Sequence, residues 1–113
     1  MSTTGQYIEI RTADGAAEAY VARPNTSHDV PGVLLYMDAI GLRPQIEQMA
    51  ERIASWNYVV LATNVFYRHG RAADIAPKTD LREPGAREAF LPTVTPLVAG
   101  HTPDEAARDL EAY

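Results

Sequence analysis

The chain has 113 residues, of which 46% are hydrophobic and 22% charged, and its net charge is −5. This length allows one domain at most, and the composition is that of an ordinary soluble globular protein. No basic stripe is present, which argues against a nucleic-acid partner. The chain has no cysteine. Its residues therefore offer no disulfide, thiolate zinc site or cysteine nucleophile, which fits a reducing compartment.

The N-terminal residues 1–6 lack the apolar core of a signal peptide. The longest apolar runs are about five residues, far too short to span a membrane. We therefore expect a cytoplasmic protein without membrane contact.

Two strands are predicted at the start of the chain, over residues 6–12 and 17–22. Polar residues at 7, 9 and 11 alternate with Ile8 and Ile10, which is the period of a half-buried strand. The sequence Ala13-Asp14-Gly15 between the two strands supplies a hairpin turn. A proline-bounded polar loop follows over residues 24–31.

A strand, a helix and a second strand are predicted next. Residues 33–38 form an apolar run that ends in an acid, as expected of a strand buried on both faces. Residues 44–56 carry an apolar stripe at helical spacing, with Pro44 at the first position and Asn57 suited to closing the last turn. Residues 58–62 form another buried strand. This order predicts a parallel βαβ unit.

Residues 64–100 show no regular apolar periodicity, and four prolines interrupt them. We expect a long loop there, either a lid-like segment or a disordered excursion, with a short helix over 82–91. A final helix is predicted from Thr102, which caps it, with Pro103 at the first position and Glu105 completing a capping box. Its apolar face should consist of Ala106, Ala107, Leu110 and Tyr113.

The acid at the end of the buried strand carries the most specific signal. Residues 36–44 read Tyr-Met-Asp-Ala-Ile-Gly-Leu-Arg-Pro, and together with the hairpin and the βαβ unit they resemble the N-terminal half of the dienelactone hydrolase family. That family more often has Glu-Ile-Phe-Gly at this turn, so that Asp38 falls on the glutamate and Gly41 on the glycine. Residues 64–68 correspond to the family's Asp-Leu-Tyr segment. The resemblance covers nearly the whole chain and implies an α/β fold, the N-terminal half of an α/β-hydrolase.

The resemblance also implies hydrolysis of an ester or lactone through a nucleophile, a histidine and an aspartate, without a metal or other cofactor. Asp38 matches the acid beside the nucleophile, and the backbone N–H of Ala39 matches one half of the oxyanion hole. Arg82 and Arg87 are candidates for binding an anionic substrate, and Tyr67 for lining the pocket. The alternatives are a loop or capping carboxylate for Asp38, surface charge for the arginines, and core packing for Tyr67.

The nucleophile itself is missing from this sequence. No Gly-x-Ser-x-Gly or Gly-x-Cys-x-Gly elbow occurs, and Ser2, Ser27 and Ser55 lack flanking glycines. In the family this elbow lies one strand after the helix that matches residues 102–113. We therefore interpret residues 1–113 as a single incomplete domain, inactive by itself, that represents a truncated or partial hydrolase.

An incomplete sheet has consequences for partners. By analogy with the α/β-hydrolase sheet, the four strands would order first, second, fourth, third. The strand at 33–37 would normally have the strand of the nucleophile beside it, and because that neighbour is missing here, it is expected to become an edge. An apolar edge recruits other chains, so we expect self-association or pairing with the missing C-terminal half.

Two other functions stay open. The chain is alternatively a short non-catalytic protein for binding or homo-oligomerisation, or a nucleotide-binding fragment, although no G-x-G-x-x-G fingerprint is present. His28, His69 and His101 have no metal or triad spacing and are expected to be exposed. Trp56 is expected to pack beneath the central helix.

Overall fold

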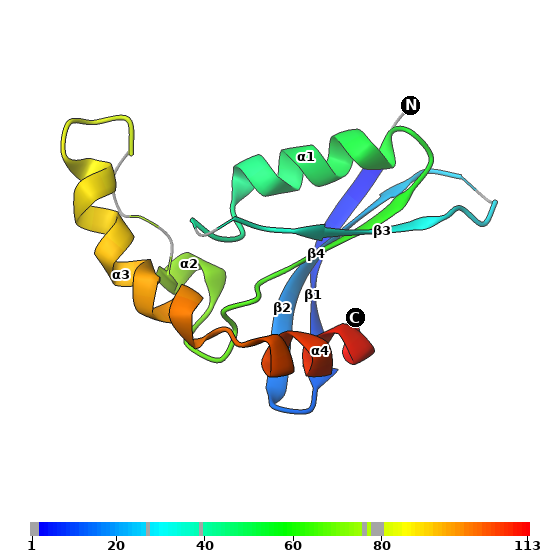
Figure 1. Ribbon diagram of the computed structural model, residues 1–113. Helices are drawn as coiled ribbons and strands as arrows, with labels where there is room; N and C mark the ends of the chain where they lie inside the picture. Colours follow the sequence, from blue (N-terminus) through cyan, green and yellow to red (C-terminus); the bar gives the residue numbers. More distant parts are fainter. Residues whose placement is uncertain (1–2, 27, 39, 76, 78–80) are drawn as a thin grey trace.

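The computed structural model describes residues 3–26, 28–38, 40–75, 77 and 81–113. It contains a mixed sheet flanked by helices (Figure 1). In chain order the elements are β1 (Thr3–Thr12), β2 (Gly15–Pro24), β3 (Gly32–Tyr36), α1 (Pro44–Ala54), β4 (Val59–Thr63), α2 (Ala72–Ile75), α3 (Ala86–Gly100) and α4 (Pro103–Ala112). The strand order is β1-β2-β4-β3, which confirms the expected order and the α/β class.

The N-terminal hairpin is longer than its alternating pattern indicated. Its register pairs Thr12 with Gly15, which leaves a two-residue turn of Ala13 and Asp14. The strands extend to Thr3 and Pro24 because β2 pairs with β4 as well as with β1, which supports its C-terminal half from both sides. The aromatic rings of Tyr7 and Tyr20 pack edge to face across the hairpin, with centroids 5.1 Å apart.

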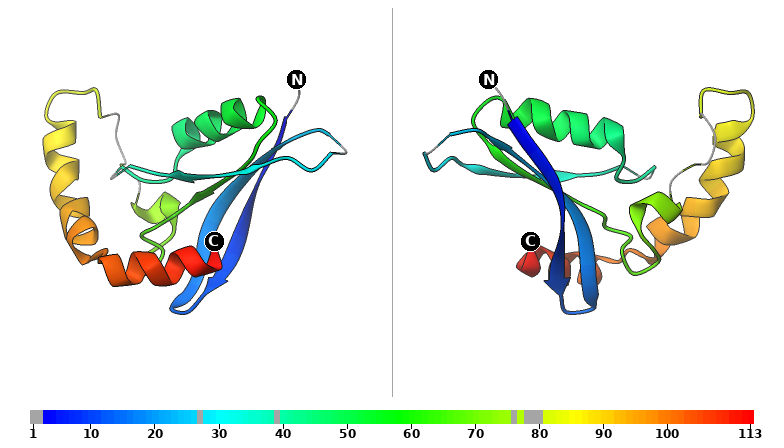
Figure 2. Two further views of the ribbon diagram at one scale, coloured as in Figure 1. Left: turned by 45° about the vertical axis from the view of Figure 1, so that its right-hand side comes forward. Right: turned by 180° about the vertical axis from the view of Figure 1, so that it is seen from behind.

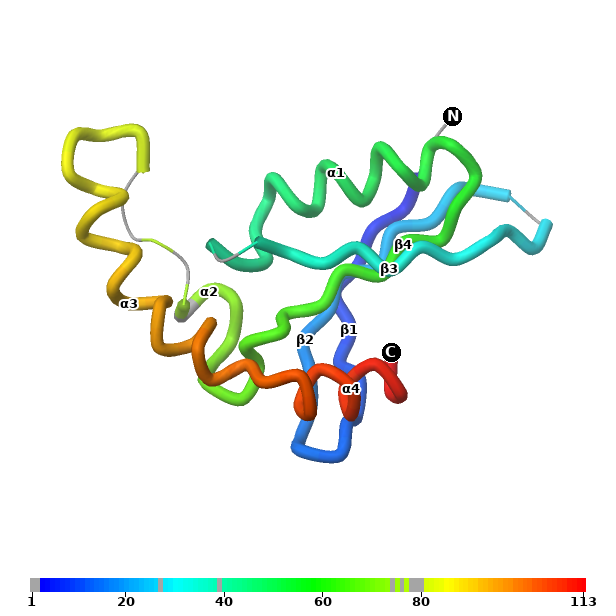
Figure 3. Tube along the Cα trace, in the orientation of Figure 1, coloured from blue at the N-terminus to red at the C-terminus, as the bar shows by residue number. Residues whose placement is uncertain are grey.

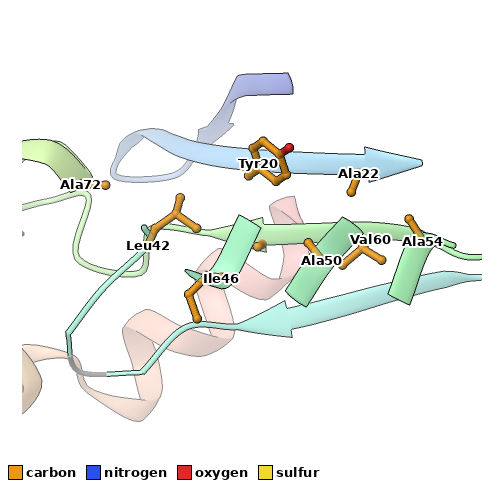
Figure 4. Packing of buried hydrophobic residues seen from close by; sticks show 9 residues of the cluster. Tyr20, Ala22, Leu42, Ile46, Ala50, Ala54, Val60 and Ala72 are labelled. Carbon is orange, nitrogen blue, oxygen red and sulfur yellow. The ribbon is translucent and has the colours of Figure 1, made fainter. Parts of the chain in front are cut away.

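The βαβ unit is confirmed, since β3 and β4 pair in parallel and α1 connects them. The helix packs on one face of the sheet through Ile46, Ala50 and Ala54, each at most 3% exposed. Small residues on this stripe let the helix approach Val60 closely, and Figure 4 shows the cluster between helix and strands. Because side chains alternate along a strand, Leu61 on β4 points to the opposite face.

The end of α1 agrees with the sequence in one respect and differs in another. Asn57 takes the left-handed conformation expected of it, with φ 71°. Trp56, however, is 59% exposed, so the expectation that it packs beneath the helix is wrong. The helix ends at Ala54, and Trp56 therefore lies in the turn beyond it, off the stripe that meets the sheet.

The segment 64–100 is not a loop throughout, since it contains α2 and the fifteen-residue helix α3. Prolines were expected to limit helix formation to residues 82–91, yet Pro92 and Pro96 lie inside α3. Both are exposed and four residues apart, so the carbonyls that lose a hydrogen bond, those of Glu88 and Pro92, lie on the side facing water. Figure 2 shows α3 standing to one side of the sheet.

The C-terminal helix begins as predicted, because the backbone N–H of Glu105 donates to Thr102 Oγ1 at 3.3 Å. It lies beside the hairpin, with the C-terminus against the sheet (Figure 3). Tyr113 shares a concavity with Leu61, which places it on the face opposite α1. The orientation of the helix differs from expectation, since Leu110 is 53% exposed and Asp109 is its only buried residue.

The remaining expectations concern single residues and membranes. His28 and His69 are exposed as expected, whereas His101 is half-buried because it caps the C-terminus of α3. Within the described part of the chain, no helix combines the length and apolar character needed to cross a bilayer.

Candidate active site

The loop after β3 is built around the carboxylate of Asp38. Its Oδ1 accepts hydrogen bonds from the backbone N–H groups of Ile40 at 3.1 Å and Gly41 at 3.3 Å. Gly41 also donates to the carbonyl of Asp38 at 3.1 Å and has φ +106°, a conformation that glycine adopts most readily. The side chain of Asp38 thus fixes a tight turn at the carboxyl end of β3, where α/β proteins place their ligands.

Arg43 holds this carboxylate from the other side. Its guanidinium donates to Oδ1 and Oδ2 of Asp38 at 2.6 and 3.0 Å, and to the carbonyl of Gly41 at 2.8 Å. The side chain of Arg43 is 17% exposed and that of Asp38 53%. The guanidinium and the two backbone N–H groups lower the pKa of Asp38, against a smaller opposing effect of burial. Asp38 is therefore an ionised, oriented carboxylate at neutral pH.

Arg43 was not among the site residues predicted from the sequence. The available signal was its position, five residues after Asp38 and directly before the proline that begins α1. A chain reversal at Gly41 brings two residues at that separation together, and a guanidinium binds a carboxylate with two parallel hydrogen bonds.

We predict that replacing Arg43 by glutamine raises the pKa of Asp38 toward the ordinary value of about 3.9. A carboxyl whose folded-state pKa is depressed stabilises the fold above its unfolded pKa, and this contribution is lost as pH falls through the folded pKa. The variant should therefore lose about 0.5–1 kcal/mol of stability at pH 7 and little at pH 2.

Carboxyl 13C NMR titration measures the pKa of Asp38, and urea unfolding at pH 7 and pH 2 measures the loss of stability. Arg52→Gln serves as control, because Arg52 is exposed at the far end of α1. An unchanged pKa of Asp38 in the Arg43 variant would contradict this account.

A cavity of about 390 Å³ adjoins the Asp38–Arg43 pair. It lies between the turn, the start of α1 and the segment that leads into α3, and both Arg82 and Arg87 line it with Arg43. Among the described residues, those that line it are Ile40, Arg43, Gln45, Pro77, Leu81, Arg82 and Arg87. Arg82 and Arg87 each bring a guanidinium to this cavity, and a guanidinium can bind a carboxylate or another anionic group with two parallel hydrogen bonds.

Tyr67 does not lie at this cavity. Its hydroxyl bonds Thr12 at 2.6 Å and Asp109 at 2.8 Å, and the guanidinium carbon of Arg68 lies 4.6 Å from its ring centroid. Burial is the main cause that raises the pKa of this hydroxyl. Tyr67 thus joins the turn that follows β4 to the hairpin and to α4, and the neighbouring Phe66 is a core residue, 4% exposed.

Arg68 is the centre of the same network. It donates two hydrogen bonds to Asp109, at 2.7 and 2.9 Å, and two to Asp14, at 2.6 and 3.0 Å. The side chain of Asp109 is 2% exposed. The network explains the orientation of α4, because these hydrogen bonds place the carboxylate of Asp109, rather than Leu110, on the side of the helix that faces the sheet.

Ala39, the expected oxyanion donor, lies outside the described residues. Within those residues, no three histidine, aspartate or glutamate side chains gather as a metal site would require. The candidate active site is therefore the turn after β3 with Asp38 and Arg43, together with the arginine-lined cavity beside it.

Comparison with known proteins agrees with this fold. Solved structures that resemble it are a proposed dienelactone hydrolase from Klebsiella pneumoniae subsp. pneumoniae MGH 78578, at TM-score 0.73 and 20% identity, and a protein named m3DLH, at TM-score 0.67 and 18% identity. A third is a dienelactone-hydrolase-like promiscuous phosphotriesterase from metagenomic libraries, at TM-score 0.65 and 20% identity. Each match covers 99% of this chain, but only 42% of the first structure and 43% of the others.

No curated protein matches the sequence. The model of the dienelactone hydrolase family matches residues 17–112, which span β2 through α4. This chain therefore belongs to the dienelactone hydrolase family.

Proposed function

We propose that these residues form the N-terminal part of a cytoplasmic hydrolase that cleaves esters or lactones bearing an anionic group. The observation that carries the proposal is the oriented carboxylate of Asp38 beside a cavity lined by Arg82 and Arg87, in a chain of this family. The nucleophile elbow, catalytic aspartate and histidine would come from sequence outside these 113 residues, because no elbow motif occurs within them.

The chemistry assigns each residue a separate task. When a nucleophile attacks the carbonyl carbon of an ester, negative charge develops on the carbonyl oxygen, and a backbone N–H such as that of Ala39 stabilises it by about 3–4 kcal/mol. Asp38, held ionised by Arg43, would orient the nucleophile and accept its hydrogen bond. Arg82 and Arg87 would hold the anionic substituent of the substrate away from the scissile bond.

The charge of the cavity also distinguishes between substrates. One structural neighbour is described as a promiscuous phosphotriesterase, and a phosphotriester is neutral. Two arginines at the cavity favour an anionic lactone or ester over a neutral triester, because a charge-assisted hydrogen bond is about twice as strong as a neutral one.

We predict that the 113-residue chain alone hydrolyses 4-nitrophenyl acetate at the background rate. Translating the same reading frame beyond Tyr113 should add a Gly-x-Cys-x-Gly or Gly-x-Ser-x-Gly elbow and restore turnover, which alanine at the elbow abolishes. Intact mass confirms which chain is assayed. Turnover by the 113-residue chain that survives repurification and disappears in Asp38→Ala would contradict the proposal, as would a continued frame without an elbow.

A non-catalytic role is the second candidate, favoured by the uncharged, apolar sequence of the outer strand β3. In that case the reading frame beyond Tyr113 encodes no elbow motif, and the chain acts by binding another chain or a second copy of itself.

A further inference from the structure

The cavity beside Asp38 contains a side chain that the proposed function does not use, that of Gln45. Among the described residues that line the cavity, Gln45 alone is polar and uncharged. It occupies the second position of α1, directly after Pro44, and the first turn of this helix faces α3 (Figure 1). The cavity therefore has Gln45 on its α1 side and Arg87 on its α3 side.

Arg43 determines which way round the amide of Gln45 lies. Nη2 of Arg43 donates to Oε1 of Gln45 at 3.3 Å. Because a guanidinium has donors only, the amide must turn its oxygen, and not its nitrogen, toward Arg43. The NH2 group of Gln45, which has two donors, consequently lies on the side of the amide that points away from this guanidinium.

The described side chains at this cavity supply donors, and none presents a free acceptor. The oxygen of Gln45 is turned to Arg43, and the guanidinium groups of Arg82 and Arg87 have donors alone. A ligand group that only accepts, such as an ionised carboxylate, matches this set. A carboxamide of the same size and planar shape brings an NH2 group, for which these side chains offer no partner.

We propose that the side-chain amide of Gln45 donates a hydrogen bond to the carboxylate of the substrate and so determines the preference for a carboxylate over a neutral group of equal size. This inference rests on the proposed function, in which Arg82 and Arg87 hold the same carboxylate. A site whose groups donate rejects a ligand group that must itself donate, because both sets of N–H groups are left unpaired.

Exchanging the donor of Gln45 for an acceptor tests this assignment. Gln45→Glu replaces the NH2 group by an oxygen at nearly constant shape, and Gln45 is exposed, so the fold should be kept. The ligands are a five-membered lactone that carries a carboxylate and the primary carboxamide of the same compound. Isothermal titration calorimetry with the 113-residue chain should show that the wild type prefers the carboxylate. Gln45→Glu should bind the carboxylate at least about 100-fold more weakly and the carboxamide more tightly, so that the preference reverses.

Gln45→Met removes the donor without adding a charge. Its affinity for the carboxylate should fall by about 10-fold, and its affinity for the carboxamide by a smaller factor. The pKa of Asp38, measured by carboxyl 13C NMR, should stay at its wild-type value in this variant, because Arg43 keeps its two bonds to Asp38. If Gln45 served only to hold Arg43 in place, its loss would shift that pKa.

Gln48→Glu is the matched control, because it makes the same chemical change one turn further along α1. Gln48 is exposed and lies outside the cavity. The variant has the same net charge as Gln45→Glu, and solvent and salt screen its new carboxylate. Its affinities for the two ligands should therefore stay within about 2-fold of the wild-type values.

Three outcomes would overturn the role of Gln45 while leaving the proposed function intact. They are equal weakening of carboxylate and carboxamide binding in Gln45→Glu, the same losses in Gln48→Glu, and full carboxylate affinity in Gln45→Met. A wild-type chain that binds neither ligand would remove the anionic substrate from the proposed function, and the role of Gln45 with it. Hydrolysis itself is tested separately, by the ester assay.

Discussion

Replacing Arg68 by methionine is expected to lower the free energy of unfolding by about 2–4 kcal/mol. The substitution keeps an apolar side chain of similar length but leaves Asp109, 2% exposed, without its cation. Removing one partner of a buried ion pair costs roughly 3–5 kcal/mol, because the other charge stays buried and uncompensated. We expect a somewhat smaller loss because Arg68 is itself 15% exposed.

The matched control is Arg71→Met, the same change three residues away. Arg71 is 65% exposed and pairs with Glu9 at 3.5 Å and Glu18 at 3.6 Å. Exposed pairs of this kind contribute roughly 0–1 kcal/mol. Urea unfolding followed by far-UV circular dichroism measures both variants, since Trp56 is 59% exposed and a poor reporter of folding by fluorescence. Equal losses in the two variants would contradict a special role for Arg68.

The stability lost in Arg68→Met should be concentrated in α4. Asp109 is the only buried residue of α4, so Arg68→Met is expected to speed amide hydrogen exchange throughout α4 more than in α1. In the double variant Arg68→Met, Asp109→Leu the buried charge is gone, and most of the lost stability should return. A double variant less stable than Arg68→Met would show that the carboxylate of Asp109 contributes beyond its pairing with Arg68.

The parts of the fold that could be predicted from the sequence depend on local patterns. Alternation indicated the hairpin, the apolar stripe indicated α1, and Thr102 marked the start of α4; each signal lies within about ten residues. The strand order followed from resemblance to the family rather than from the pattern itself. The structure agrees with all four predictions.

Predictions that depend on contacts distant in the sequence were less successful. The bonds from Arg68 to Asp109 and Asp14 join residues 41 and 54 positions apart. They decide which side of α4 faces the sheet, against the apolar pattern that favoured Leu110. The spacing of residues along the sequence does not predict such a network, because its members meet only when the hairpin, β4 and α4 are assembled.

In the candidate site, too, the residue marked by a local pattern could be predicted, whereas those that depend on the folded chain could not. Asp38 could be identified because it ends an apolar strand, whereas its partner Arg43 depends on the turn at Gly41. Arg82 and Arg87 were candidates through the family alone, and the geometry that joins them to Arg43 at one cavity comes from the fold around it. The position of α3 could not be predicted, since its two prolines argue locally against a helix that the structure contains.

Reversing the charge of both cavity arginines, in Arg82→Glu, Arg87→Glu, is expected to abolish binding of an anionic ligand by the 113-residue chain. Charge-assisted hydrogen bonds contribute about 1.5–3 kcal/mol each, and the new glutamates repel the anion as well. The expected loss of affinity is therefore at least about 100-fold. Each single reversal should weaken binding by roughly 10-fold or more.

A suitable ligand pair is a five-membered lactone that carries a carboxylate and the methyl ester of the same compound. Isothermal titration calorimetry should detect the carboxylate with the wild-type chain, more weakly at higher salt, and should detect little of the neutral ester. The double variant should bind the two compounds equally poorly. Asp38–Arg43 remains intact in this variant, so the turn after β3 keeps its structure.

The control is a pair of reversals that change the net charge by the same amount elsewhere. Arg52→Glu and Arg23→Glu alter exposed residues outside the cavity, and together they should leave affinity for the carboxylate nearly unchanged. If they reduced binding as much as the cavity reversals, the anion would be responding to overall charge rather than to a site. Full affinity in Arg82→Glu, Arg87→Glu would remove the cavity from the proposed substrate site and leave only the turn at Asp38.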